Sequence, residues 1–343
     1  EYIGQKIDDI LKYNVDIFAI GSDWEGKFDY LNEYCKVIYL ERTKGVSSSE
    51  LRSEKRKLRM TVEGDDFLGT KFRNESRFVN GVEIASADAD AYYLVTTPDK
   101  HYEQIKKFLL DGKHVLCESP IACSGKECKE LFEIAKKQKC VLMEGIKTAY
   151  STAYSRLLLL AKSGEIGKIV SVDATCTSMR DDLDSLENKW NSISAWGPTA
   201  LLPIFQLLGT NYTDKKIISH YIDDDKMFDG FTKIDFIYPD SVASIKVAKT
   251  AKSEGELIIT GTKGYIYVPA PWWKTDYFEI RYEDPTENKR YFYKLDGEGI
   301  RYEIVAFNRS IESGKNYSYI DSKISIAISE IIEACKSNNV IEI

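Results

Sequence analysis

A glycine-flanked turn at residues 64–69 is the first feature of the sequence that could do chemistry. Gly64 and Gly69 match the first and third glycines of the pattern G-x-G-x-x-G, and the turn follows an apolar stretch and opens a helical one. Such a turn lets backbone amides at a helix N-terminus approach a pyrophosphate. Asp66 stands at the second glycine, where its carboxylate would repel that anion. The turn therefore predicts either a weakened dinucleotide site or an ordinary connection between a strand and a helix.

The acidic residue that would bind the ribose of such a dinucleotide is harder to place. It is expected about 20 residues after the motif, where Glu83 falls within a strand and leaves Ser86 and Asp88 as candidates. Too few residues separate Ser86 from the next strand for the usual crossover helix. We therefore expect that helix to be deleted from the chain or missing from this sequence.

Alternating strands and helices surround these residues. The apolar pattern predicts strands at 58–63, 81–85, 91–97, 114–117 and 141–144, and amphipathic helices at 67–78, 101–111 and 126–137. Consecutive βαβ units give a parallel sheet with helices on both faces. We therefore predict a Rossmann-like α/β domain at residues 57–150.

The pattern changes after Tyr150. Helices are predicted at 154–163 and 200–208, a long strand at 169–178, further strands from 217 to about 293, and closing helices at 300–313 and 322–335. The strands alternate, as in Lys233-Ile234-Asp235-Phe236, which is typical of an antiparallel sheet with one face in water. We therefore predict an α+β domain with a mostly antiparallel open sheet at residues 151–335.

A smaller unit precedes both domains. Residues 5–13 are predicted to form a helix, and residues 15–20 and 36–40 two strands. This α/β fragment at residues 1–52 has too little around it for a core of its own. The charged stretch at residues 53–57 is typical of a linker.

Bulk composition argues against several classes of protein. A chain of 343 residues suits two domains with a fragment of a third, and a net charge of −7 argues against nucleic-acid binding. No apolar run approaches the ~20 residues of a membrane span, and no signal peptide opens the chain, so we expect no membrane partner. Seven scattered Cys and only three His favour reduced thiols in a cytoplasmic protein without a metal site. The first residue is Glu1 rather than Met, so the natural start could lie upstream.

Three motifs point to one family. They are Thr96-Thr97-Pro98-Asp99-Lys100-His101, Gly112-Lys113-His114-Val115-Leu116-Cys117-Glu118-Ser119-Pro120, and Ser163-Gly164-Glu165-Ile166-Gly167. They resemble the T-P-N-x-x-H, G-K-H-V-x-x-E-K-P and S-G-x-I-G hallmarks of the glucose–fructose oxidoreductase, inositol dehydrogenase and rhizopine-catabolism (Gfo/Idh/MocA) family. The resemblance extends over roughly residues 57–335.

The resemblance implies an NAD or NADP cofactor and a small-molecule substrate, namely a polyol, sugar or sugar phosphate. The cofactor would lie at the carboxyl ends of the parallel strands, with its pyrophosphate near Gly64, Asp66 and Gly69. Its nicotinamide would lie near Thr96, Thr97, Pro98, His101, Glu118, Ser119 and Pro120. The resemblance also implies a homo-oligomer that pairs through the antiparallel sheet.

The chain departs from this family at residues that move protons. Ser119 replaces the lysine of the E-K-P motif, and the positions of the family's Asp, His and second Asp on a later helix hold Ala195, Thr199 and Leu202. A proton must move with the hydride when an alcohol becomes a carbonyl, and these replacements cannot move it well. Lys147 and Tyr150 are the best remaining donors, although Lys147 could instead bind an acidic substrate or remain solvated. A module that has lost its chemistry and only binds or scaffolds is therefore the alternative function.

The N-terminal unit carries a second resemblance. Its sequences G-S-D-W-E-G-K-F-D and R-T-K-G-V-S-S-S resemble signatures of glycerol-3-phosphate cytidylyltransferases. This implies CTP binding by Asp23, Trp24, Arg42, Thr43, Ser47, Ser48 and Ser49. The H-x-G-H motif of that family has no counterpart in the sequence. The unit is therefore either an inactive remnant or part of a cytidylyltransferase whose first half is missing, and its presence suggests a link to CDP-polyols and surface polysaccharide.

Overall fold

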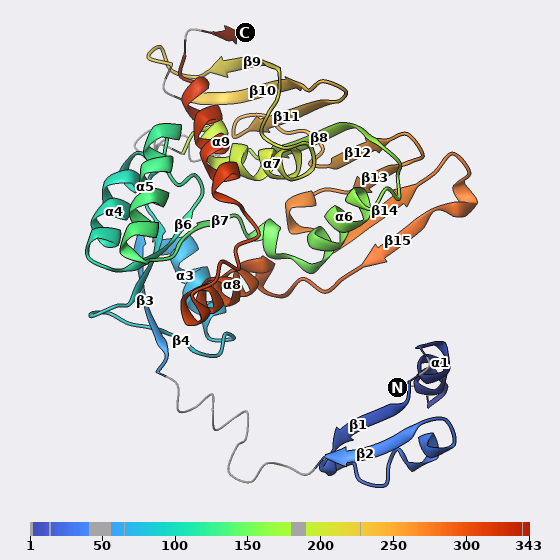
Figure 1. Ribbon diagram of the computed structural model, residues 1–343. Coiled ribbons are helices and arrows are strands. Elements are labelled where there is room, and N and C mark those ends of the chain that lie inside the picture. The colour runs from blue at the N-terminus through green and yellow to red at the C-terminus, as the bar shows by residue number, and fades with distance from the viewer. Residues whose placement is uncertain are drawn as a thin grey trace. The chain divides into compact units, whose positions relative to one another are not determined.

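The computed structural model describes residues 3–13, 15–40, 56–64, 66–179, 190–226, 228–337 and 339–343. The chain divides into two compact units, Glu1–Arg56 and Lys57–Ile343 (Figure 1). The division falls in the charged stretch that the sequence marks as a linker. The predicted Arg42, Thr43, Ser47, Ser48 and Ser49 of the CTP site lie outside the described residues.

Unit 1 is a small α/β fragment. It contains α1 (Ile3–Tyr13), β1 (Ile17–Gly21), η1 (Ser22–Trp24), η2 (Asp29–Glu33) and β2 (Lys36–Leu40), and its two strands are parallel. Ile10 and Leu31 are the buried hydrophobic residues in its described part. The ring of Phe28 lies between those of Phe18 and Trp24, at centroid distances of 5.4 and 5.9 Å. This thin core agrees with the expectation that the fragment cannot form a domain alone.

The first sheet of unit 2 is parallel throughout. Its strands β3 (Leu58–Gly64), β4 (Val82–Ile84), β5 (Ala91–Val95), β6 (His114–Glu118) and β7 (Leu142–Gly145) lie in the order β4-β3-β5-β6-β7. Helices α4 (Pro98–Leu110) and α5 (Gly125–Gln138) cover one face, and α3 (Asp66–Ser76) and α8 (Ile300–Ser313) the other (Figure 1). The Rossmann-like layering predicted from the sequence is therefore confirmed.

This sheet lacks the crossover helix that normally follows its second strand. Only the six residues 85–90 join Ile84 to Ala91, and they pass across β3 without a helix. Ala85 N–H donates to the carbonyl of Met60, and Arg59 bonds Asp88 at 2.6 Å and the carbonyl of Ala87 at 2.8 Å. The order resembles the dinucleotide-binding order 3-2-1-4-5-6 with strand 3 and its helix removed. The short connection expected from the sequence is thus present.

The second sheet has nine strands and is mostly antiparallel. The order is β15-β14-β13-β12-β8-β11-β10-β9-β16, with parallel pairing only for β8 with β11 and for β9 with β16 among the described residues. The strands are β8 (Ile169–Thr177), β9 (Asp214–Tyr221), β10 (Asp229–Ile237), β11 (Val242–Ala248), β12 (Leu257–Gly261), β13 (Tyr265–Val268), β14 (Tyr277–Arg281), β15 (Lys289–Phe292) and β16 (Val340–Glu342).

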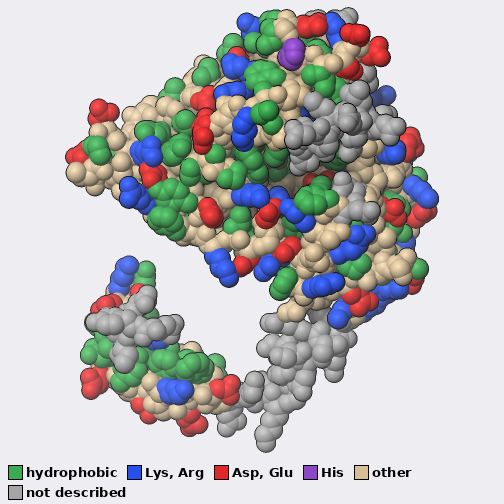
Figure 2. Space-filling view, turned by 180° about the vertical axis from the view of Figure 1, so that it is seen from behind, with side chains coloured by type: hydrophobic (Ala, Val, Ile, Leu, Met, Phe, Trp, Pro, Cys, Tyr) green, Lys and Arg blue, Asp and Glu red, His purple; other side chains and the backbone are tan. Residues whose placement is uncertain are grey.

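One face of this sheet is covered by helices and the other is open. The helices α6 (Thr152–Lys162), α7 (Ser192–Leu208) and α9 (Ser322–Ala334) pack on the covered face. On the open face Lys233 bonds Asp235 at 2.6 Å, whereas the intervening Ile234 is buried. Charged and hydrophobic side chains are mixed on this side of the unit (Figure 2). The predicted open antiparallel sheet is confirmed.

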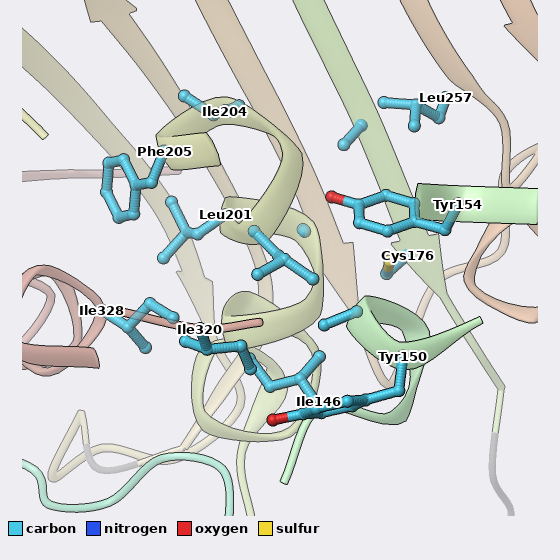
Figure 3. Packing of buried hydrophobic residues seen from close by; sticks show 14 of the residues in the cluster. Ile146, Tyr150, Tyr154, Cys176, Leu201, Ile204, Phe205, Leu257, Ile320 and Ile328 are labelled. Atoms are coloured by element: carbon cyan, nitrogen blue, oxygen red, sulfur yellow. The ribbon is translucent and has the colours of Figure 1, made fainter. Parts of the chain in front are cut away.

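The core between α7 and the sheet is formed by large apolar side chains. Leu201, Ile204 and Phe205 of α7, together with Tyr154 and Cys176, are all buried in this core, with Tyr154 and Cys176 on the opposite side of α7 from Leu201 and Phe205 (Figure 3). Each fully buried aliphatic or aromatic side chain contributes about 1.5–3 kcal/mol. The helix begins at Ser192, eight residues before the predicted start, and contains Pro198 and Pro203 in its interior.

A buried carboxyl group holds the N-terminus of α7. Asp229 is 3% exposed and accepts hydrogen bonds from the Ile193 amide at 3.1 Å and the Thr232 hydroxyl at 2.7 Å. Burial raises the pKa of Asp229 to about 7, against an ordinary value of 3.8, and the hydrogen bonds only partly oppose this. The folded chain therefore keeps a proton that the unfolded chain loses between about pH 4 and pH 7.

We expect Asp229→Asn to remove this pH dependence. Because the native state alone binds the proton in that window, wild-type stability falls as the pH rises from 4 to 7. The difference in unfolding free energy should shift in favour of the variant by about 1.4 kcal/mol per pH unit in the steepest part of the window. Urea unfolding of both proteins at pH 4, 5.5, 7 and 8 measures the difference. A constant difference across this range would contradict the assignment.

Gly64 permits the close approach of β3 to β5. Its φ of +119° is open to glycine, and an added Cβ would lie 2.4 Å from the carbonyl carbon of Val95 and 2.6 Å from the amide nitrogen of Thr96. Both neighbours are backbone atoms, so neither can move aside easily. Gly112 has a φ of +72° but open space around its Cβ position.

We expect Gly64→Ala to destabilise unit 2 more than Gly112→Ala. The Gly112 variant bears only the conformational penalty of a left-handed residue, about 1–2 kcal/mol, whereas the Gly64 variant adds the overlap with Val95. Denaturant unfolding of the two variants separates these effects. Equal losses of stability would show that the overlap is relieved cheaply.

Candidate functional site

Four strand ends meet at one edge of the parallel sheet. Gly64 pairs with Val95 at the ends of β3 and β5, and Glu118 pairs with Gly145 at the ends of β6 and β7. The segments that leave these ends carry most of the residues predicted for the cofactor and catalysis: Asp66, Gly69, Thr96, Thr97, Pro98, His101, Ser119, Pro120, Lys147 and Tyr150. The carboxyl edge is where open α/β sheets bind ligands, so the structure brings these segments to one place.

Two glycines in the turn after β3 allow close packing of the backbone. Gly64 touches the backbone of β5, and an added Cβ on Gly69 would lie 2.9 Å from Cγ1 of Val62, so Gly69 lets α3 pack closely on its strand. Helix α3 begins at Asp66. The side chain of Asp66 lies outside the described structure. The backbone geometry therefore fits the first and third positions of a dinucleotide-binding turn.

The loop after β5 ends in an unsatisfied hydroxyl group. Thr97 is the N-cap of α4 and Pro98 follows it in the first turn. The Thr97 Oγ1 atom is buried and has no hydrogen-bond partner among the described residues, whereas Thr96 Oγ1 donates to Gln104 Oε1 at 2.5 Å. A buried orphan hydroxyl at a helix N-terminus is a group that a bound ligand could satisfy.

His101 joins two loops of the site. Its ring is fully buried, with Nδ1 2.7 Å from the carbonyl oxygen of Pro120 and Nε2 2.9 Å from that of Thr96. Burial lowers the pKa of His101, and the two carbonyls oppose that shift. Both ring nitrogens therefore face backbone oxygens. His101 fixes the loops after β5 and β6, and its direct contact with a cofactor stays a prediction.

Three carboxyl groups lie beneath the loops, of which Glu144 and Glu303 are buried and Glu118 is partly buried. Tyr93 donates to Glu118 Oε1 at 2.5 Å, Ser119 donates to Glu144, and Glu303 of α8 lies so close that an added Cβ on Gly145 would be 3.3 Å from its Oε1. Burial raises the pKa of all three carboxyl groups. For Glu303 the neighbouring charge of Glu118 adds to the rise, whereas the Lys147 ammonium opposes it. Glu118 and Glu303 therefore form a pair that resists losing both protons.

Lys147 lies beside that pair and is held by a second acidic residue. Its Nζ donates to Glu298 Oε2 at 2.8 Å, and Lys274 donates to Glu298 Oε1 at 2.7 Å. Lys71 of α3 lies 3.4 Å from Glu298 Oε2. Burial alone would raise the pKa of Glu298, but the bonds from Lys147 and Lys274 lower it to about 2. Lys147 therefore carries an ammonium group at the carboxyl edge, where it could donate a proton.

Tyr150 is less accessible than Lys147. It is 4% exposed, its hydroxyl lies 3.1 Å from Ser318 Oγ, and its ring belongs to the core (Figure 3). Burial raises the pKa of Tyr150. Its hydroxyl therefore contacts the segment between α8 and α9, and the predicted catalytic role finds no support in this geometry.

The helix that resembles the family's proton-transfer helix is α7. Ala195 and Thr199 are partly exposed near its start, and Leu202 is fully buried. Trp196 lies between them, donates to Ser178 Oγ at 3.1 Å and packs 4.9 Å from the Trp273 ring. None of these side chains can exchange a proton in place of an imidazole or a carboxylate.

Several residues of the site were not predicted from the sequence. Glu303 follows the start of an amphipathic helix, where an acidic residue is ordinarily exposed, so its burial left no signal. Glu298 stands between Gly297 and Gly299, and this Gly-Glu-Gly pattern does signal an unusual turn. Lys71 and Lys274 resemble ordinary surface lysines in the sequence.

Figure 2 shows a hollow in unit 2 with Lys and Arg side chains along its border.

Unit 1 places two of its predicted CTP residues on the surface. Asp23 and Trp24 form part of η1 directly after β1 and are exposed. Lys27 lies over the Trp24 ring at 4.8 Å.

The described residues lack two kinds of feature. No helix there is long and apolar enough to cross a bilayer. No cluster of His, Cys, Asp and Glu there is arranged to hold a metal ion.

The N-terminal unit and the parallel sheet are similar to different proteins. The chain is 56% identical over 50 residues to glycerol-3-phosphate cytidylyltransferase of Bacillus spizizenii, which covers 15% of this chain and 39% of that enzyme. It is 41% identical over 76 residues to scyllo-inositol 2-dehydrogenase (NADP+) of Bacillus subtilis, which covers 22% of this chain and 23% of that enzyme. The chain thus spans less than half the length of these curated relatives.

The fold of unit 2 is also found in solved structures. A 3-ketoreductase from Actinomadura kijaniata, solved with NADP and TDP-benzene, superposes with a TM-score of 0.70 at 16% identity, over 84% of this chain and 99% of that one. A model of the oxidoreductase family with an NAD-binding Rossmann fold matches residues 64–146. These residues contain the carboxyl-edge loops from Gly64 to Ile146 described above. The part of the chain that is similar to this oxidoreductase family is therefore the part that carries these loops.

Proposed function

We propose that the chain is an NAD(P)-dependent oxidoreductase that acts on a polyol, a sugar or a sugar phosphate. The observation that carries this proposal is the ammonium group of Lys147 at the carboxyl edge of a sheet whose loops match an NAD-binding family. The names of the similar dehydrogenases and the ketoreductase, all of which act on carbonyl or hydroxyl groups, support the substrate class. Cytoplasmic localisation remains part of the proposal and fits the free cysteines.

The residues present fit one half of a nicotinamide dinucleotide. Gly64, Gly69 and the start of α3 would hold the pyrophosphate, and the orphan hydroxyl of Thr97 with the loop Glu118–Pro120 would hold the nicotinamide end. The adenosine half has less support. β4 ends opposite Met60, four residues before Gly64, and Asp88 bonds Arg59, five residues before it. At about 3.3 Å per residue these positions lie roughly 13–17 Å from the turn.

These positions suggest a role in the reaction for the cofactor and for each nearby residue. The cofactor would accept or supply the hydride. Lys147 would donate a proton to the carbonyl oxygen of the substrate during reduction, because its nitrogen is an ammonium group paired with Glu298. Glu118 and Glu303 lie next to Lys147 and could return a proton to it. Ser119 cannot supply this proton because its hydroxyl donates to Glu144.

We expect Lys147→Ala to reduce turnover by about 10²-fold or more, because proton donors typically contribute 10²–10⁴-fold. Turnover of a panel of polyols, sugars and sugar phosphates with NAD and NADP is followed at the nicotinamide absorbance. Tyr150→Phe is the comparison variant, since the Tyr150 hydroxyl lies 3.1 Å from Ser318 Oγ and its loss should change stability more than rate. Brisk wild-type turnover that survives Lys147→Ala would place the proton donor elsewhere.

The cofactor site makes a separate prediction at Asp66. A carboxylate at the start of α3 repels the pyrophosphate, so Asp66→Gly should tighten NAD(H) and NADP(H) binding about tenfold. Wild type and variant should also discriminate little between NAD and NADP, since no acidic group reaches the adenosine ribose among the described residues. Calorimetric titration with all four dinucleotides measures both effects. Absence of binding up to millimolar concentrations in both proteins would show that the site is vestigial.

A second candidate is a binding or scaffold module without oxidoreductase chemistry. The observation that favours it is the set of replaced proton-transfer positions at Ser119, Ala195, Thr199 and Leu202. Activity that appears only in Ser119→Lys would support this reading, because the lysine would restore a lost group on an intact fold.

We also propose a metabolic context and an oligomeric state for the chain. The fragment similar to a glycerol-3-phosphate cytidylyltransferase suggests a role in CDP-polyol supply for a surface polysaccharide. A cytidylyltransferase that lacks its first half remains the other reading of unit 1. The open face of the nine-stranded sheet exposes Ile237 beside its pairing partner Val242, which supports a homo-oligomer through that face.

A further inference from the structure

Three lysines from separate elements converge on one carboxylate. Lys71 lies on α3, Lys147 in the segment after β7, and Lys274 in η4 (Trp272–Lys274), which precedes β14 of the large sheet. Their nitrogens lie 3.4, 2.8 and 2.7 Å from the two oxygens of Glu298. The side chains of all four residues are partly exposed, at 28–40%. An incoming solute could therefore reach them.

The cluster carries an excess of positive charge. Three ammonium groups face one carboxylate, and the nearby acidic side chains on the same side have partners of their own. Glu75 bonds Arg301 at 2.6 Å, and Asp296 bonds Lys294 at 3.1 Å. Two further acidic neighbours among the described residues are Glu303, which is buried, and Glu118, which is partly buried, and burial raises the pKa of both carboxyl groups. The lysines thus outnumber the charges that neutralise them.

The backbone around Glu298 is bent so that the carboxylate reaches the lysines. Gly297, Glu298 and Gly299 have φ values of +58°, +54° and +92°. A side chain on Gly299 would meet the Lys147 carbonyl at 2.8 Å, and one on Gly297 would overlap Glu75. Glu298 itself adopts a left-handed conformation that residues with a Cβ rarely take. The three successive left-handed residues are therefore held in place by the ion pairs of one carboxylate.

The position of the cluster links it to the reaction. Lys147 follows the end of β7 by two residues, and α3 follows the turn at Gly64. Lys274 comes from the opposite side, from the large-sheet part of the unit. An anion held by all three would therefore lie where the parallel sheet meets the antiparallel sheet, next to the proposed proton donor.

We propose that Lys71, Lys147 and Lys274 form a phosphate-binding site that the Glu298 carboxylate fills until a phosphate group displaces it. This inference rests on the proposed function, for which it identifies the substrate as a phosphorylated polyol or sugar. A phosphate dianion offers three oxygens to three ammonium groups, whereas the carboxylate offers two. The pyrophosphate of the cofactor has the same chemistry, and α3 places Lys71 near its expected position.

The first experiment measures binding of inorganic phosphate to the whole chain by calorimetry. Glu298→Gln keeps the shape of the side chain and removes the competing charge, so phosphate should bind at least tenfold more tightly. Lys274→Met should weaken binding at least tenfold. Lys263→Met, at an exposed lysine of the β12–β13 turn, is the matched control and should leave affinity unchanged. Equal phosphate affinity in wild type, Glu298→Gln and Lys274→Met would overturn the proposal.

A second measurement identifies the source of the phosphate. If the substrate supplies it, Lys274→Met raises KM at least tenfold for a phosphorylated polyol, leaves KM for the unphosphorylated polyol unchanged, and leaves NADP affinity unchanged. If the cofactor supplies it, the same variant weakens NADP binding, and phosphate competes with NADP; this result retains the site and overturns the substrate assignment. Phosphate binding without any turnover would contradict the proposed function and leave the site standing. Turnover without phosphate binding would do the reverse.

Discussion

Burial of carboxyl groups beneath the carboxyl edge of the parallel sheet constrains the rest of the site. Glu144 and Glu303 are buried and Glu118 is partly buried, and a buried carboxylate is unstable unless neighbours donate hydrogen bonds or a positive charge. Tyr93 donates to Glu118, Ser119 donates to Glu144, and the Lys147 charge favours the ionised forms of Glu118 and Glu303, whereas one oxygen each of Glu144 and Glu303 has no hydrogen-bond partner among the described residues. Ser119 stands where the resembled family has a lysine. Its hydroxyl donates a hydrogen bond to Glu144 and so has a structural role. The remaining positive charge is supplied from the next loop, by Lys147.

The parts of the fold that were predictable follow from repeated patterns. Alternating apolar strands and amphipathic helices indicated the parallel sheet. The alternation of charged and apolar residues along a strand, as in Lys233 and Ile234, indicated the antiparallel sheet. The predicted start of α7 was wrong by eight residues, because Asn191 caps a helix that begins at Ser192 and the Ile193 amide donates to Asp229 of a strand far along the chain. The short edge strand β16 carries too few residues for a detectable pattern.

The candidate site was also predictable only in part. Loops at strand ends were predictable because a parallel sheet brings its carboxyl ends together, whereas the individual residues came from the glycine pattern for Gly64 and from the family resemblance for Thr97, Glu118 and Lys147. Contacts between segments that are distant in the sequence were not predictable. Glu298 and Glu303 approach Lys147 from about 150 residues away, and nothing in local spacing records that approach. The catalytic role of Tyr150 stays a prediction, and its burial shows that an aromatic side chain near a loop can also belong to the core.

The shortened connection after β4 and the lysine cluster bear on the same question of how ligands are held. With only six residues between β4 and β5, β4 ends opposite Met60, four residues before Gly64, so the described part of the sheet offers no acidic side chain at that strand end and the adenosine end of a dinucleotide would gain little from it. Affinity must then come from the pyrophosphate and nicotinamide end, where anion contacts dominate. Lys71 and Lys147 stand at that end on the same elements as the turn and the proton donor, and Lys274 joins them from the second sheet. A chain that has lost contacts at the adenosine end thus concentrates its remaining charge where a phosphate and a reacting carbon would lie side by side.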